Sequence, residues 1–165
     1  MKDGSWIAVP FGVAFFAGGY WFGLRLSAIP DIHVFKVMNI IGLACDFAGI
    51  AILSKFIMSS AKAKAFVVEH LTPQLTNMFA GVPTGMVAAT VLGPTAPSHL
   101  VVRDFSIALQ FTLAWPGLLY AIYWAKKRRL SAAARDLRVT IVGSFFLVLG
   151  LLIQLVAAFQ DLYAK

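Results

Sequence analysis

The residue of this sequence whose type and position most favour chemistry is Asp46, a single carboxylate in the middle of the apolar stretch 34–59. A charged side chain at the centre of a membrane costs about 3 kcal/mol or more unless it is paired, protonated or facing water. Asp46 therefore suggests a proton or ion site, or a charge partner for another subunit. The alternative is structural, with a protonated Asp46 that makes one hydrogen bond between helices. The sequence leaves both interpretations open.

Small and polar residues accompany Asp46 at helical spacing. Asn39, Gly42, Asp46 and Gly49 stand at positions i, i+3, i+7 and i+10, which places all four on one stripe of a helix. Small residues let membrane helices approach closely, and polar residues hydrogen-bond across the contact. The pattern predicts that this face packs against protein and is hidden from lipid.

Two glutamines form a second candidate group. Gln110 lies in the apolar stretch 104–125 and Gln154 in the stretch 139–162. Measured from the midpoints of these stretches, both lie in the outer half at similar depth, because a helix rises about 1.5 Å per residue. Antiparallel neighbours would let the two amides hydrogen-bond each other, which is worth roughly 0.6–1.7 kcal/mol in a membrane. The alternative is a polar lining shared with Asp46.

Patterns for catalysis and for metal binding are absent from the sequence. It contains no HExxH, no GxSxG, no P-loop and no dinucleotide-binding glycine pattern, so we expect no enzymatic activity. His33, His70 and His99 fall at or outside the ends of apolar stretches, which does not suit a haem held between helices. His70, His99 and Glu69 fit no standard zinc spacing. We expect no metal and no cofactor. Cys45 is the only cysteine, so no disulfide forms within the chain.

Four long apolar stretches must position these side chains. They cover residues 5–28, 34–59, 104–125 and 139–162, and each reaches the ~20 residues that cross a bilayer as a helix. The chain of 165 residues is 60% hydrophobic and 13% charged, with a mean hydropathy of +0.83. Soluble domains are about 25% charged. The sequence predicts an all-α membrane protein, a four-transmembrane-helix bundle that forms one integral membrane domain over residues 1–165.

The basic block at 126–129 sets the expected orientation. It directly follows the stretch 104–125, and such a block holds a helix end on the cytoplasmic side. With 126–138 cytoplasmic, alternation places both termini and the segment 60–103 outside. Helix ends and anionic lipid explain most of the net charge of +7, so we expect no nucleic-acid partner.

The segment between the second and third stretches is irregular in composition. Residues 61–71 predict a short helix on the membrane surface. Proline and glycine recur from 73 to 97, and residues 78–92 are apolar but interrupted. This composition predicts an interfacial or re-entrant segment, because broken backbone at membrane depth is tolerated only where protein or water covers it. A fifth span is the competing interpretation, and it would reverse the orientation of the N-terminal half.

Glycines and a proline shape two of the predicted helices. In the first stretch Gly19 and Gly23 form a GxxxG pattern, and Ala14 and Gly18 repeat the spacing on an adjacent face. Such small residues permit close contact within the bundle or with a partner chain. The sequence Trp-Pro-Gly at 115–117 predicts a kink in the third span, either a static bend or a hinge.

These features predict a small polytopic membrane protein, which we expect in the inner (plasma) membrane of a bacterium. We expect it to act as an accessory, assembly or structural subunit of a membrane complex or homo-oligomer, because small-residue faces suit contact with other membrane helices. The alternative is a small channel or transporter that uses Asp46 and the re-entrant segment 73–97. The expected partners are the lipid bilayer and membrane-protein chains, including copies of this one.

Overall fold

The computed structural model describes residues 5–115 and 132–163, and within these ranges the chain is all-helical with no strand. Two π turns and one 3-10 turn interrupt or join the α-helices. The elements are α1 (Ser5–Ser27), α2 (Val34–Leu53), the 3-10 turn η1 (Ser54–Phe56), α3 (Ala61–Phe66), the π turn η2 (Val67–Leu71), α4 (Thr72–Leu92), α5 (His99–Leu109), the π turn η3 (Gln110–Ala114) and α7 (Ala132–Tyr163).

Three helical stretches of the described part are long and apolar enough to cross a membrane, which indicates a membrane location. They are Val34–Phe56, Ala61–Leu92 and Asp136–Tyr163. The first and third correspond to two of the four expected spans. The expected span 5–28 coincides with α1, whose crossing stays a prediction, and 104–125 extends beyond the described residues.

The segment 61–92 corrects the sequence prediction. Ala61–Leu92 is continuously helical through α3, η2 and α4, where we expected a surface helix followed by an interfacial or re-entrant segment. Pro83 lies inside α4, and membrane helices tolerate proline because neighbouring groups satisfy the freed backbone atoms. Gly81 and Gly85, whose composition suggested a break, lie instead where α4 closely approaches α1.

A π turn precedes a proline at two places in the chain. η2 ends two residues before Pro73, and η3 ends two residues before Pro116. A proline ring clashes with the carbonyl group four residues earlier, and the wider π turn before Pro73 relieves that crowding. In η2 the wider turn is visible as a hydrogen bond from the N–H of Thr72 to the carbonyl oxygen of Val67. Pro116, at the centre of the expected kink at 115–117, lies outside the described residues.

The chain divides into two compact units, each built from two stretches of sequence. The first combines residues 1–32 with 73–128, and the second combines residues 33–72 with 129–165. The first unit therefore holds α1, almost all of α4, and α5. The second holds α2, α3 and α7.

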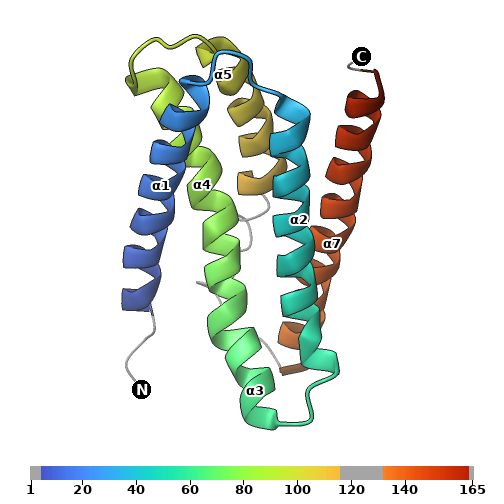
Figure 1. Cartoon of the computed structure of the whole chain (residues 1–165). Coiled ribbons are helices and arrows are strands. Elements are labelled where there is room, and N and C mark those ends of the chain that lie inside the picture. Colours follow the sequence, from blue (N-terminus) through green and yellow to red (C-terminus); the bar gives the residue numbers. More distant parts are fainter. Residues whose placement is uncertain (1–4, 116–131, 164–165) are drawn as a thin grey trace. The chain divides into compact units, whose positions relative to one another are not determined.

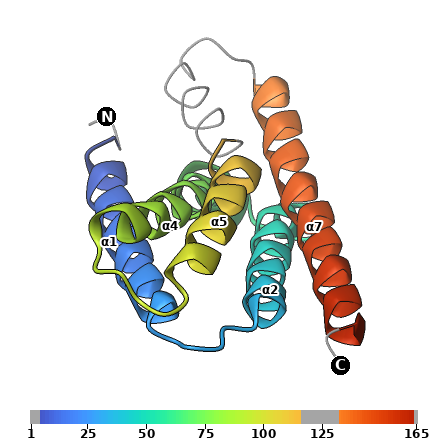
Figure 2. The same cartoon turned by 90° about the horizontal axis from the view of Figure 1, so that it is seen from above.

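In the first unit α1 and α4 run parallel, as Figure 1 shows. Gly81 of α4 approaches Phe15 of α1, and Met86 approaches Gly23, so the contact advances toward the C-terminal end of both helices. α5 then turns back along α4, and the three helices lie side by side in Figure 2. Because α1 and α4 are parallel, the chain between them must return from one end of this unit to the other.

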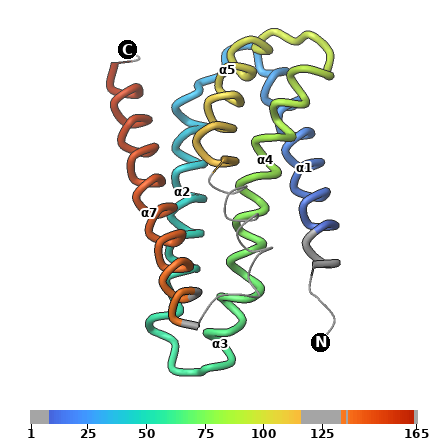
Figure 3. Tube along the Cα trace, turned by 180° about the vertical axis from the view of Figure 1, so that it is seen from behind, coloured from blue at the N-terminus to red at the C-terminus, as the bar shows by residue number. Residues whose placement is uncertain are grey.

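In the second unit α2 and α7 form an antiparallel pair, which can be followed in Figure 3. Gly42 lies against Gln154, and Gly49 lies against Gly143. Later residues of α2 therefore meet earlier residues of α7, as in an antiparallel pair. α7 begins at Ala132 and not at 139, so the part of the expected polar loop 126–138 that the structure describes, residues 132–138, is helical.

Candidate functional site

The predicted stripe on α2 faces α7 through its two glycines. A Cβ atom added at Gly42 would come within 2.7 Å of Cγ of Gln154. At Gly49 it would come within 2.8 Å of the carbonyl oxygen of Gly143. Such distances leave no space for a methyl group, so the backbones approach as closely as glycine allows. Asn39, the first member of the stripe, is exposed.

α7 contributes matching glycines to the same contact. Gly143 and Gly150 stand seven residues apart on α7, as Gly42 and Gly49 do on α2. A Cβ atom at Gly143 would lie 2.9 Å from Cγ2 of Ile52. The heptad spacing keeps glycines on the contact face of both helices, since seven residues are close to two full helical turns.

Asp46 is the polar centre of the α2–α7 contact. Its Oδ2 accepts a hydrogen bond from Nε2 of Gln154 on α7. Its Oδ1 is fully buried and has no hydrogen-bond partner among the described atoms. Gly150 makes room for Oδ1, because a Cβ atom at that position would collide with it and would lie 2.7 Å from the carbonyl oxygen of Gly42.

The two predicted glutamines have different partners in the structure. Gln154 donates to Asp46 in the second unit. Oε1 of Gln110 lies 3.1 Å from Oγ1 of Thr84 in the first unit, and that hydroxyl also lies 2.7 Å from the carbonyl oxygen of Ala80. Each glutamine thus hydrogen-bonds within its own unit, where the sequence had suggested a bond between Gln110 and Gln154. The similar depth of the two glutamines in their apolar stretches was not enough to identify Thr84 and Asp46 as their partners.

The small-residue pattern of α1 divides between two environments. Gly19 and Gly23 are buried against α4, and a Cβ atom at Gly23 would lie 3.0 Å from Cα of Met86. Ala14 and Gly18 are exposed, and a Cβ atom at Gly18 would meet nothing within 4 Å. The GxxxG pair therefore serves a contact within the chain, and the adjacent pair does not.

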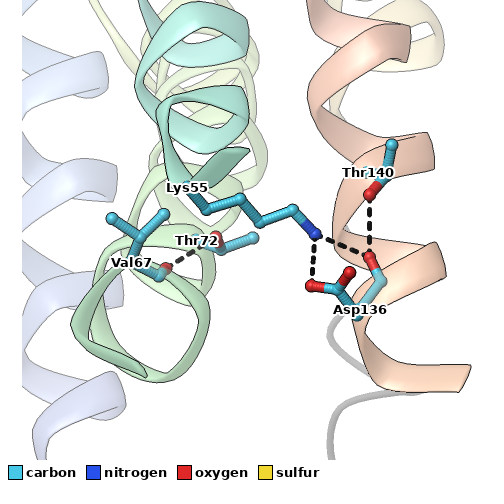
Figure 4. A network of polar contacts seen from close by, with 5 residues as sticks. All are labelled: Lys55, Val67, Thr72, Asp136 and Thr140. Carbon is cyan, nitrogen blue, oxygen red and sulfur yellow. Dashed lines mark hydrogen bonds and ion pairs between the residues drawn. The ribbon is translucent and has the colours of Figure 1, made fainter. Parts of the chain in front are cut away.

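An ion pair between α2 and α7 was missed by the sequence analysis. Nζ of Lys55, in η1 at the end of α2, lies 2.7 Å from Oδ1 of Asp136 and 2.7 Å from its carbonyl oxygen (Figure 4). Thr140 donates to that same carbonyl oxygen at 2.9 Å. The side chain of Lys55 is 3% exposed and that of Asp136 is 59% exposed. The signal in the sequence was one cation and one anion near the same end of two antiparallel stretches.

Two of the histidines that fit no metal-binding pattern in the sequence, His70 and His99, make local contacts. The ring of His70 stacks on Phe66, with centroids 5.6 Å apart. Nε2 of His99 lies 2.5 Å from the carbonyl oxygen of Thr90 near the end of α4. Within residues 5–115 and 132–163, no three His, Cys, Asp or Glu residues gather closely enough to hold a metal ion.

Comparisons of this chain with protein-family models, with curated proteins and with solved structures found no match. Its chemistry is therefore inferred from geometry. In the α2–α7 contact, one carboxylate oxygen of Asp46 accepts a hydrogen bond from the amide of Gln154, and the other is buried against Gly150. Such a site can hold two helices in one register, because the polar pair and the glycines fix where the two backbones meet.

Proposed function

We propose that this chain is a polytopic membrane protein that serves as an accessory, assembly or structural subunit of a membrane complex or homo-oligomer, and that it is not itself an enzyme. The observation that carries the proposal is the distribution of side chains in the α2–α7 pair. The small residues and the Asp46–Gln154 pair lie between the two helices, whereas many of the large apolar residues are exposed. On α2 the exposed residues are Ile40, Leu43, Phe47 and Ile50.

The exposed apolar residues of α2 stand at i, i+3, i+7 and i+10 and form a continuous stripe. A soluble monomer rarely exposes a contiguous apolar surface of that kind, whereas a membrane protein presents it to lipid or to partner helices. α7 adds a similar surface that includes Leu151, Leu155 and Phe159, which are 56%, 54% and 54% exposed. These two surfaces support a role in which the chain contacts other membrane chains along its length.

We also propose that the chain crosses the membrane five times. The crossings are α1, α2, the continuous helix that ends in α4, the helix that begins with α5, and α7. The parallel packing of α1 and α4 supports this topology, because parallel neighbours that both cross require an intervening crossing, which α2 supplies.

The distribution of positive charge favours the same topology. With the basic block at 126–129 cytoplasmic, five crossings place ten lysines and arginines on the cytoplasmic side and four on the other. The cytoplasmic ones are at 2, 55, 62, 64, 126, 127, 128, 129, 135 and 138, and the others are at 25, 36, 103 and 165. The four-crossing alternative places eight inside and six outside. Cytoplasmic segments carry the excess of positive charge, so five crossings fit better.

Purification of the tagged full chain in mild detergent tests the subunit role. Mass photometry and denaturing gels would then identify the associated chains. Partner chains in fixed stoichiometry, or a uniform homo-oligomer, are the expected result. A uniform monomer that retains no other chain across several mild detergents would contradict the proposal.

A small channel or transporter is the second candidate, and the free Oδ1 of Asp46 favours it. The re-entrant segment expected at 73–97 is not part of this candidate, because α4 is a continuous helix. The test is ion or proton flux into liposomes that contain the purified chain. Asp46→Asn should abolish flux and keep the fold if Asp46 carries the ion. Absence of flux by the wild-type chain would eliminate this candidate.

A further inference from the structure

The turn that joins α2 to α3 combines exposed lysines with exposed large apolar side chains. We call this group the α2–α3 surface, and it consists of Phe56, Ile57, Lys62, Lys64 and Phe66. Phe56, Ile57 and Phe66 are 59%, 88% and 58% exposed. Lys62 and Lys64 are also exposed, and the ammonium group of neither makes a hydrogen bond or an ion pair with any described residue. We propose that this surface binds anionic lipid headgroups of the cytoplasmic leaflet.

Helix length places the α2–α3 surface at the edge of the bilayer. α4 alone, Thr72–Leu92, has 21 residues and a length of about 32 Å, which matches the ~30 Å hydrocarbon core. The preceding helical residues of Ala61–Leu71 add about 16 Å, so they start at the edge of the core and pass through the headgroup layer. α2 reaches the same layer at its C-terminal end, where η1 begins.

The chemistry of this surface matches an anionic lipid interface. Apolar side chains at such a turn insert at the boundary between headgroups and acyl chains, and lysines reach the phosphates. Ile57 and Phe66 supply the apolar groups, and Lys62 and Lys64 supply the charge. Lys55 does not take part, because its ammonium group is buried and paired with Asp136.

The leaflet follows from the proposed topology. Five crossings put the turn between α2 and α3 on the cytoplasmic side, where anionic lipids give the membrane surface its negative potential. This inference rests on the crossings of α2 and α4, and it does not depend on the proposed role as a subunit. Failure to find partner chains would leave it unaffected.

Lipid retention by the full chain tests the proposal directly. The chain is equilibrated with equal amounts of phosphatidylglycerol and phosphatidylcholine in mild detergent, and retained lipids are counted by native mass spectrometry. Wild type should prefer phosphatidylglycerol. Lys62→Gln and Lys64→Gln should each lower that preference about fivefold, because one basic residue near the surface contributes roughly that factor.

Lys36→Gln is the matched control. Lys36 is an exposed lysine at the opposite end of α2, next to the ring of Phe35. This variant should keep the wild-type preference. Equal retention of the two lipids by wild type, or an equal loss in Lys36→Gln, would overturn the proposal.

A second measurement distinguishes binding of this surface to lipid from binding to a soluble partner. A nitroxide attached through Ile57→Cys, in a chain that also carries Cys45→Ala, reports whether residue 57 lies in lipid or in water. In nanodiscs the label should be more accessible to oxygen than to a water-soluble nickel chelate. A label that is fully accessible to nickel would overturn the lipid assignment and would favour a soluble partner at this turn.

Discussion

Gly150 of α7 leaves the space that Oδ1 of Asp46 occupies on α2. The same carboxylate accepts a hydrogen bond from Gln154, one helical turn further along α7. A glycine and an amide on one helix thus receive one acidic side chain from its neighbour. This arrangement links the closeness of the two backbones to the placement of a polar group, because a larger residue at 150 would collide with Oδ1.

Substitution of Gly150 by alanine should therefore weaken the α2–α7 contact. The added methyl group would collide with Oδ1 of Asp46 and crowd the carbonyl oxygen of Gly42. Overpacking of this kind costs about 1–3 kcal/mol. The measurement is the free energy of unfolding in bicelles by steric trapping. Gly18→Ala is the control, because a Cβ atom there meets nothing within 4 Å, and it should be neutral or slightly stabilising. Equal effects of the two substitutions would contradict the proposed contact.

A double-mutant cycle should detect the bond between Asp46 and Gln154. Asp46→Leu and Gln154→Leu should each destabilise the fold, and the double variant should cost less than their sum by roughly 0.6–1.7 kcal/mol. The shared hydrogen bond is already lost in either single variant, which is the reason for the deficit. The comparison cycle pairs Asp46→Leu with Gln110→Leu, whose amide contacts Thr84. That cycle should be additive within about 0.5 kcal/mol, and coupling there instead would reassign the polar partner of Asp46.

The stripe on α2 was predictable from sequence, but its partner was not. Helical periodicity alone aligns Gly42, Asp46 and Gly49 on one face, and small residues predict close packing. The partner depends on the register between two helices, which periodicity does not encode. The midpoint of the apolar stretch 139–162 is also not the midpoint of the helix, because α7 begins at Ala132.

The helix at 61–92 could not be predicted because proline and glycine serve two purposes. In a loop they break secondary structure, and in a membrane helix they permit close packing or a local π turn. Gly81 and Gly85 lie against α1, and Pro73 follows η2. The proline and glycine content of this segment fits both a re-entrant segment and a packed membrane helix. Only the contact with α1 distinguishes the two interpretations.

The ion pair between Lys55 and Asp136 should respond unequally to removal of its two members. Asp136→Asn leaves a buried ammonium group without a counter-charge, with only neutral carbonyl oxygens as acceptors, and should cost about 1–2 kcal/mol. A fully buried pair costs about 3–5 kcal/mol to break, but Asp136 is largely exposed and screened. Lys55→Met should cost less than about 1 kcal/mol, because it removes the buried charge and keeps an apolar stem.

Asp104→Asn is the control for the ion pair, since Arg103 and Asp104 form an exposed pair at 3.0 Å. Its effect on the free energy of unfolding should be about 0–0.5 kcal/mol. The three variants are compared by the same steric-trapping assay. A larger cost for Lys55→Met than for Asp136→Asn would mean that the ammonium group itself, and not its desolvation, determines the stability of this end of α2.

Cysteine accessibility should distinguish the five-crossing topology from its alternatives. Single cysteines are introduced at Asp31, Ser59 and Thr95 in a chain that carries Cys45→Ala; all three positions are exposed in turns between helices. In intact cells an impermeant maleimide should label Asp31→Cys and Thr95→Cys but not Ser59→Cys, because α2 and α4 each cross the bilayer between these turns. Permeabilisation should then expose Ser59→Cys. A four-crossing chain with 60–103 outside would label at 59 and 95 and not at 31. Labelling at 59 alone would keep the five crossings and invert their orientation, against the distribution of lysine and arginine.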